Sequence, residues 1–175
     1  MKWNTLTFVA IGALAAFYVV LSAPGAILAA VMANPMFSAI GNLIIIGIAY
    51  ALVALLIQRV GAVTLWALVV GMLFIPLPLA GPPGALIKVV ILGSAGLLAD
   101  IIYLIFRKSD KIAAVVIGST QVGSTVIWVA PVLGVTNVVA GGLIGLIFGG
   151  LLGYLAYFIY TRIKSTAVVK RIQSS

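Results

Sequence analysis

Long apolar runs separated by short polar or turn-forming segments dominate the chain. A membrane-spanning helix needs about 20 mostly apolar residues, and six stretches of the sequence meet this requirement. The first is expected to break at residues 22–25, where a proline and a glycine follow one another, and the third ends at the prolines Pro76 and Pro78. The six predicted spans cover residues 5–30, 39–57, 61–79, 85–106, 112–133 and 137–161.

The pattern predicts an all-α polytopic membrane protein, a bundle of six transmembrane helices. Helices are favoured because a segment crossing lipid must satisfy its own backbone hydrogen bonds. The connections are short, so consecutive helices should pack as antiparallel neighbours, and Gly81-Pro82-Pro83-Gly84 is the clearest turn. We therefore expect one transmembrane domain at 1–161 and a basic cytoplasmic tail at 162–175.

The basic residues predict the orientation of the bundle. Cytoplasmic loops carry an excess of Lys and Arg, and with the N-terminus inside, the inner segments hold nine of the ten basic residues. Both termini are then cytoplasmic, in a multi-pass protein of the cell membrane. An arrangement of five spans with a re-entrant third segment would disturb this alternation. The nine are Lys2, Arg59, Arg107, Lys108, Lys111, Arg162, Lys164, Lys170 and Arg171.

The start of the chain could also be read as a secretory signal peptide. Its apolar run is longer than the 7–15 residues, roughly, of a signal-peptide core. We therefore interpret residues 5–30 as a span that stays in the protein.

The composition narrows the function classes. Hydrophobic residues make up 65% of the chain and charged residues 7%, against about 25% charged in a soluble domain. The net charge of +8 lies between apolar runs, so it indicates topology rather than nucleic-acid binding. There is no Cys or His, and the acids are Asp100 and Asp110. We thus expect no metal site, no cofactor and no catalytic constellation, and the phosphate-binding loop of ATPases is absent.

Lys88 is the one basic residue outside the inner segments. It lies about one turn into the fourth predicted span, and an ionisable residue at such depth is a functional candidate. It could equally extend its ammonium group to the outer headgroups. Asn42, one turn into the second span, and Asn137, at the start of the sixth, should share its level.

A polar stripe follows the fifth predicted span. Gln121, Ser124, Thr125 and Trp128 are spaced by three, four and seven residues from the first, so they share one helical face. Such a stripe suits a small polar or planar ligand, with hydrogen bonds for orientation and a ring for stacking. It would serve equally as interhelical hydrogen bonding. With Lys88 at the outer end, we favour a ligand cavity.

Asp100 lies in the inner half of the fourth span and should have a partner. Arg107, seven residues on, is the nearest candidate in sequence, and Arg59 or Lys111 could also reach it. A structural pairing is favoured over a proton or cation site, because a single acid is thin support for ion transport.

Small residues form faces on two predicted spans. In the sixth, Gly141, Gly145, Gly149 and Gly153 recur every four residues, which allows another helix to approach closely. The first span has its own small-residue surface. The pattern leaves open whether each partner helix belongs to the same chain. The surface of the first span comprises Ala10, Gly12, Ala13, Ala15 and Ala16.

Several of these segments resemble the substrate-binding membrane subunit, or S component, of energy-coupling factor transporters. The similarity includes the Ala-rich first span, the 81–85 turn before a Gly-rich helix, and Gly93 to Asp100 followed by Phe106-Arg107-Lys108. The chain has residues 58–62 first and then the Gly-rich helix that ends in an acid and Phe106-Arg107. This order is most similar to S components of the hydroxymethylpyrimidine/thiamine type. Two departures stand out: the spacing of small residues in the first helix is irregular, and Trp66 and Ala67 occupy the region where that type carries acids.

The resemblance implies a mechanism. An S component binds a vitamin in an outward-facing cavity, docks through its first helix on a transmembrane coupling subunit driven by two ATPases, and topples to release the ligand inside. Here the docking face would be Ala10, Gly12, Ala13 and Ala16. The ligand-binding residues, chosen by depth and polarity, would be Asn42, Lys88, Gln121, Thr125, Trp128 and Asn137.

Two other classes compete with substrate capture. A non-catalytic structural subunit of a larger membrane complex would explain the small-residue faces and the scarcity of polar groups. A channel or self-sufficient carrier would need inverted repeats or a continuous polar pathway, and neither is evident. The sequence therefore predicts a small-molecule capture subunit, with the structural subunit as the alternative.

Overall fold

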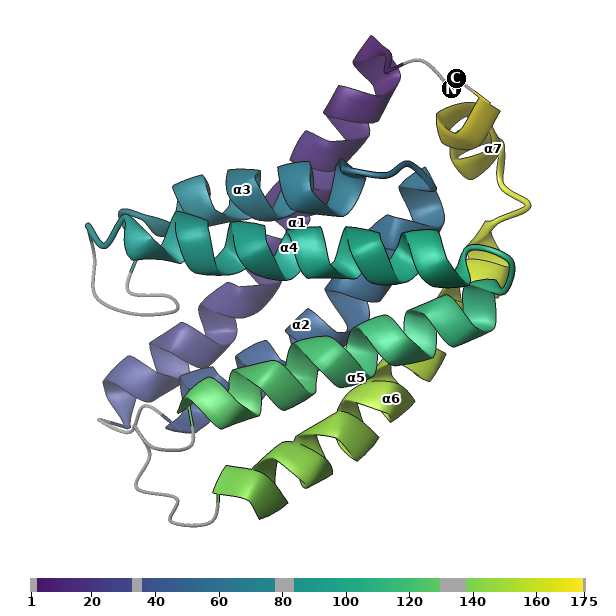
Figure 1. Cartoon of the computed structure of the whole chain (residues 1–175). Helices are drawn as coiled ribbons and strands as arrows, with labels where there is room; N and C mark the ends of the chain where they lie inside the picture. The colour runs from purple at the N-terminus through teal and green to yellow at the C-terminus, as the bar shows by residue number, and fades with distance from the viewer. Residues whose placement is uncertain (1–2, 33–35, 78–83, 130–137, 175) are drawn as a thin grey trace.

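The computed structural model describes residues 3–32, 36–77, 84–129 and 138–174, and this part of the chain is helical, with short turns and no strand. The helices pack as a bundle in which α3 and α4 run side by side, as do α5 and α6 (Figure 1). The elements are α1 (Thr5–Val31), α2 (Met36–Ile57), α3 (Ala62–Phe74), α4 (Ile87–Phe106), α5 (Asp110–Val129), α6 (Val138–Ile163) and α7 (Ala167–Ser174).

Four described helices, α1, α2, α4 and α6, are long and apolar enough to cross a membrane. Their outer surfaces are apolar as well: Val31, Val139 and Ile147 are each at least 70% exposed. So large an exposed apolar area is unfavourable in water and favourable in contact with lipid. The chain is a helical membrane protein.

The other two long elements differ from these four. The helix α3 has 13 residues and is therefore about 20 Å long, shorter than the roughly 30 Å hydrocarbon core. The third predicted span, 61–79, ends at Phe74, before the two prolines that were expected to break it. Polar residues interrupt α5, which makes it less apolar than its neighbours.

The predicted break at residues 22–25 does not occur, because α1 continues through Pro24 to Val31. Proline removes one backbone donor but is tolerated in membrane helices where nearby side chains re-satisfy the freed groups. The carbonyl that Pro24 leaves without a donor is that of Val20, four residues earlier. The buried Ser22 hydroxyl, two residues before the proline, donates a hydrogen bond to the Tyr18 carbonyl at 2.9 Å, so this polar side chain is satisfied within α1.

The glycines of α6 pack against α5 of the same chain. A Cβ at Gly149 would clash with the carbonyl of Gly118, and one at Gly153 with the carbonyl of Ala114. Farther along, a Cβ at Gly145 would come within 3.2 Å of the Gly123 Cα. The small-residue face of the sixth span therefore has its partner within the bundle, and it brings two backbones into direct contact.

The basic tail folds back onto the bundle as the short helix α7. Its Val169 and Ile172 are buried, and the Gln173 side chain donates to the Leu55 carbonyl at 3.1 Å. The Tyr160 hydroxyl accepts hydrogen bonds from Gln173 at 3.3 Å and from Gln58 at 3.0 Å. The tail is thus an amphipathic helix, and it closes the end of the bundle where α2 and α6 finish.

Replacing Gly153 with leucine should destabilise the protein strongly, because the side chain would separate the α5 and α6 backbones; overpacking of this kind costs about 1–3 kcal/mol or more. The thermal unfolding of the detergent-solubilised protein measures the effect. Gly12→Leu is the matched control, since a Cβ at Gly12 meets no atom within 4 Å. Equal melting temperatures for the two variants would contradict this packing.

Candidate functional site

Lys88 lies in the first turn of α4, and its side chain is 1% exposed. Its ammonium group donates hydrogen bonds to the carbonyl oxygens of Phe74, at 2.9 Å, and Leu77, at 2.6 Å. Phe74 is the last residue of α3, and the final carbonyls of a helix have no partner within it. The ammonium group of α4 therefore caps the C-terminus of α3 and complements its negative dipole end.

Asp100 caps the N-terminus of α3, at the other end of that helix from Lys88. Its carboxylate accepts hydrogen bonds from the Thr64 hydroxyl at 2.5 Å, the Thr64 amide at 2.8 Å and the Val63 amide at 3.3 Å. The residue before α3 is Gly61, with a φ of 89° and no side chain to cap the helix. Asp100 supplies that cap from the neighbouring helix, and its hydrogen-bond donors belong to the first turn of α3 and not to Arg107.

The distance between Lys88 and Asp100 along α4 matches the length of α3. Lys88 and Asp100 are twelve residues apart on α4, or about 18 Å, and α3 is only slightly longer. Because the helices are antiparallel, the carboxylate meets the positive end of the α3 dipole and the ammonium group meets the negative end. Glycines allow the close contact, since a Cβ at Gly96 would lie 2.8 Å from the Thr64 Cα.

The side chains of the predicted polar stripe form hydrogen bonds mainly within the bundle. The buried Gln121 side chain of α5 donates to the Ala95 carbonyl of α4 at 2.8 Å. The hydroxyls of Thr125 and Ser124 donate to the Gln121 carbonyl at 2.7 and 3.2 Å. Lys88 contacts α3, whereas Gln121 reaches α4 from α5, so these two predicted ligand residues do not converge.

Of the remaining predicted ligand residues, Asn42 lies at the end of the bundle opposite α7. Asn42 is half-buried on α2. A Cβ at Gly47 would come within 2.9 Å of Val122, and the antiparallel register then places Asn42 at the level of the last turn of α5. That turn contains Trp128, whose side chain lies outside the described residues, as does the whole of Asn137.

An aromatic cluster that sequence reasoning missed fills the space between α1, α2 and α3. The Trp66 ring makes edge contacts with Tyr18 and Tyr50, with ring centroids 5.2 and 5.0 Å apart, and Phe74 stacks on Tyr18 at 5.7 Å. The Tyr50 hydroxyl donates to the Leu92 carbonyl at 3.3 Å. Aromatic positions on three separate helices carried no shared sequence pattern, so only the fold brings them together.

The predicted docking face is largely open. Gly12, Ala13 and Ala16 are exposed on α1, while Ala10 and Ala15 face the core. Larger apolar side chains flank the exposed three, with Val9 60% and Phe17 61% exposed. A shallow strip of small residues therefore faces outward along the first helix.

Comparisons with known proteins give no relative: no protein-family model, no curated protein and no solved structure matches the chain.

Lys88→Met should lower the stability of the protein by about 2 kcal/mol, because it leaves carbonyls at the end of α3 without their charged donor. The melting temperature in detergent measures this loss. Lys108→Met removes the same charge from an exposed position and should have little effect. If Lys88 instead served the headgroups, both variants would melt together with the wild type.

Proposed function

We propose that the protein is the membrane-embedded substrate-capture subunit of an ATP-driven importer of a vitamin or similar micronutrient, working in the manner of the S components that its sequence resembles. In this proposal it docks through α1 on a transmembrane coupling subunit, which two ATPase subunits drive. The exposed small-residue strip of α1 is the observation that carries the proposal.

The proposed topology has six spans, with both termini cytoplasmic, in the cell membrane. The two remaining spans are assigned to α3 and α5, because α3 lies antiparallel along α4 and α5 lies antiparallel along α6. Basic residues end α4 and α6, begin α5 and lie on α7, all at one end of the bundle. The positive-inside rule assigns that end to the cytoplasm.

Docking through α1 is supported by the contrast between the two small-residue faces. The face of α6 is filled by α5, whereas a Cβ at Gly12 meets nothing within 4 Å. In lipid, helices associate by close packing of small residues rather than by the hydrophobic effect. Gly12, Ala13 and Ala16 offer such a surface to a helix of the coupling subunit.

The proposed ligand site lies at the end of the bundle away from the basic residues. It draws on Asn42 and the last turns of α5, with Gln121 and Thr125 deeper, and on Trp128 and Asn137 beyond the described side chains. Lys88 contributes by holding the adjoining ends of α3 and α4 together. Carbonyl dipoles stabilise its positive charge there, so no anionic ligand is needed to pair with it.

The second candidate is a structural subunit of a larger membrane complex. It is favoured by one specific observation: the polar groups of Lys88, Asp100 and Gln121 all bond to the backbone of neighbouring helices. On this view these residues stabilise the bundle, and the α1 face binds a permanent partner.

Gentle purification from the native membrane, followed by mass spectrometry of proteins and small molecules, separates the two candidates. Under the first, a coupling subunit with two ATPases, or a bound micronutrient, should accompany the chain. A stoichiometric complex without ATPases and without a ligand would exclude substrate capture and establish the structural subunit.

A Gly12→Leu, Ala16→Leu double variant should lose its membrane partner while keeping the wild-type melting temperature, because both positions are exposed. Co-purification from membranes measures the partner. Ser94→Leu, which adds similar bulk to an exposed position on α4, is the control and should keep it. Retention of the partner by the double variant would rule out docking through this face.

A further inference from the structure

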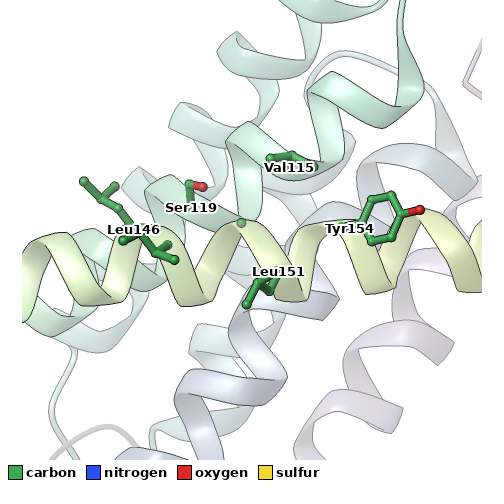
Figure 2. A pocket seen from close by; sticks show the side chains of 7 residues that line it. Val115, Ser119, Leu146, Leu151 and Tyr154 are labelled. Carbon is green, nitrogen blue, oxygen red and sulfur yellow. The ribbon is translucent and has the colours of Figure 1, made fainter.

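A groove runs between α5 and α6 on the surface of the bundle that faces lipid. Figure 2 shows Val115 and Ser119 of α5 on one side and Leu146, Leu151 and Tyr154 of α6 on the other. Its volume is about 540 Å³, and its floor is opened by Gly150, which lacks a side chain beside Ser119. Nearly all of the lining is apolar.

The length of the groove fits one leaflet of a bilayer. From Tyr154 to Leu146 the helix rises about 12 Å, while one leaflet contributes roughly 15 Å of hydrocarbon. An acyl chain of a single lipid, which extends through about that thickness, can therefore lie in the groove along most of its length.

A positive charge marks one end of the groove. The Lys111 ammonium group lies 5.2 Å from the centroid of the Tyr154 ring, and Lys111 is exposed in the first turn of α5. Further basic side chains, Lys108 and Lys164, lie on the adjoining helix ends, while Asp110 interacts electrostatically with Lys164. The positive-inside rule assigns this end to the cytoplasmic surface of the membrane, where it would present a net positive charge to the lipid phosphates.

We propose that the groove binds one anionic phospholipid from the leaflet beside the basic end of the bundle. An acyl chain lies over Gly150 between Leu146 and Leu151, and the headgroup phosphate accepts a hydrogen bond from Lys111. The ring of Tyr154 supports the lysine from below through its π face. The apolar groove binds the acyl chain of the lipid, and Lys111 provides the preference for an anionic headgroup.

Native mass spectrometry of the full-length, delipidated protein tests the proposal, with phosphatidylglycerol and phosphatidylcholine added separately. The wild type should retain one phosphatidylglycerol at about fivefold lower lipid concentration than phosphatidylcholine, the preference that one interfacial lysine confers. Lys111→Gln should remove the preference, whereas Lys108→Gln should keep it. Loss of the preference in both variants, or in neither, would overturn the role of Lys111.

Filling the groove separates chain binding from headgroup attraction. Gly150→Leu and Ser119→Leu fill it from α6 and α5 respectively, and each should weaken retention of both lipids. A Cβ at Gly150 would lie 2.8 Å from the Ser119 hydroxyl oxygen, so Gly150→Leu should also lower the melting temperature, and lipid retention is compared between the variants that remain folded. If either variant fails to fold, the other decides. Unchanged lipid retention would refute the site, as would a protein dimer that forms without lipid and that the folded filling variant abolishes.

Discussion

The arrangement of the bundle depends on the hydrogen bonds that the terminal backbone groups of α3 form with side chains instead of with water. In hydrocarbon an unpaired backbone group costs several kcal/mol, and α3 has neither the length to reach both headgroup layers nor a capping side chain of its own. Asp100 and Lys88 provide both caps from α4. Two charged side chains thereby fix the register of one helix against the other, since a shift of one turn would uncouple both.

That register propagates through the remaining helices. With α4 placed, its Leu92 carbonyl meets Tyr50 of α2, and its Ala95 carbonyl meets Gln121 of α5. Contact between the glycines of α5 and α6 then positions the last long helix. Both of these side chains bind backbone carbonyls of α4, so side-chain hydrogen bonds specify the arrangement while small residues set how close the helices lie.

The sequence predicts much of the fold because apolar length is a strong signal in a membrane protein. The positions of α1, α2, α4 and α6 follow from it, and the four-residue spacing of the glycines marks the α6 contact. It did not predict the partners of Asp100, since reach along its own helix suggested Arg107. A signal was present: an acid and a base twelve residues apart face a short helix that follows a glycine.

Other differences have physical causes that the sequence pattern does not contain. Pro24 lies within an unbroken α1, since proline is tolerated inside membrane helices. The sequence predicts the tail only as basic and cytoplasmic, and the structure adds that Val169 and Ile172, three residues apart, give α7 a buried apolar face. The grouping of Tyr18, Tyr50 and Trp66 needs three helices to meet, so no local spacing could have announced it.

The return of α7 to the bundle has a consequence for the order in which the protein is completed. Gln173 bonds to Leu55, 118 positions earlier in the chain, and α7 also contacts α1. A ribosome synthesises α7 after the six other described helices, so the C-terminal end of α2 remains uncovered until α7 has been made. Closure of this end therefore follows the synthesis of α7, and a nascent protein halted before α7 would expose the surface that α7 covers.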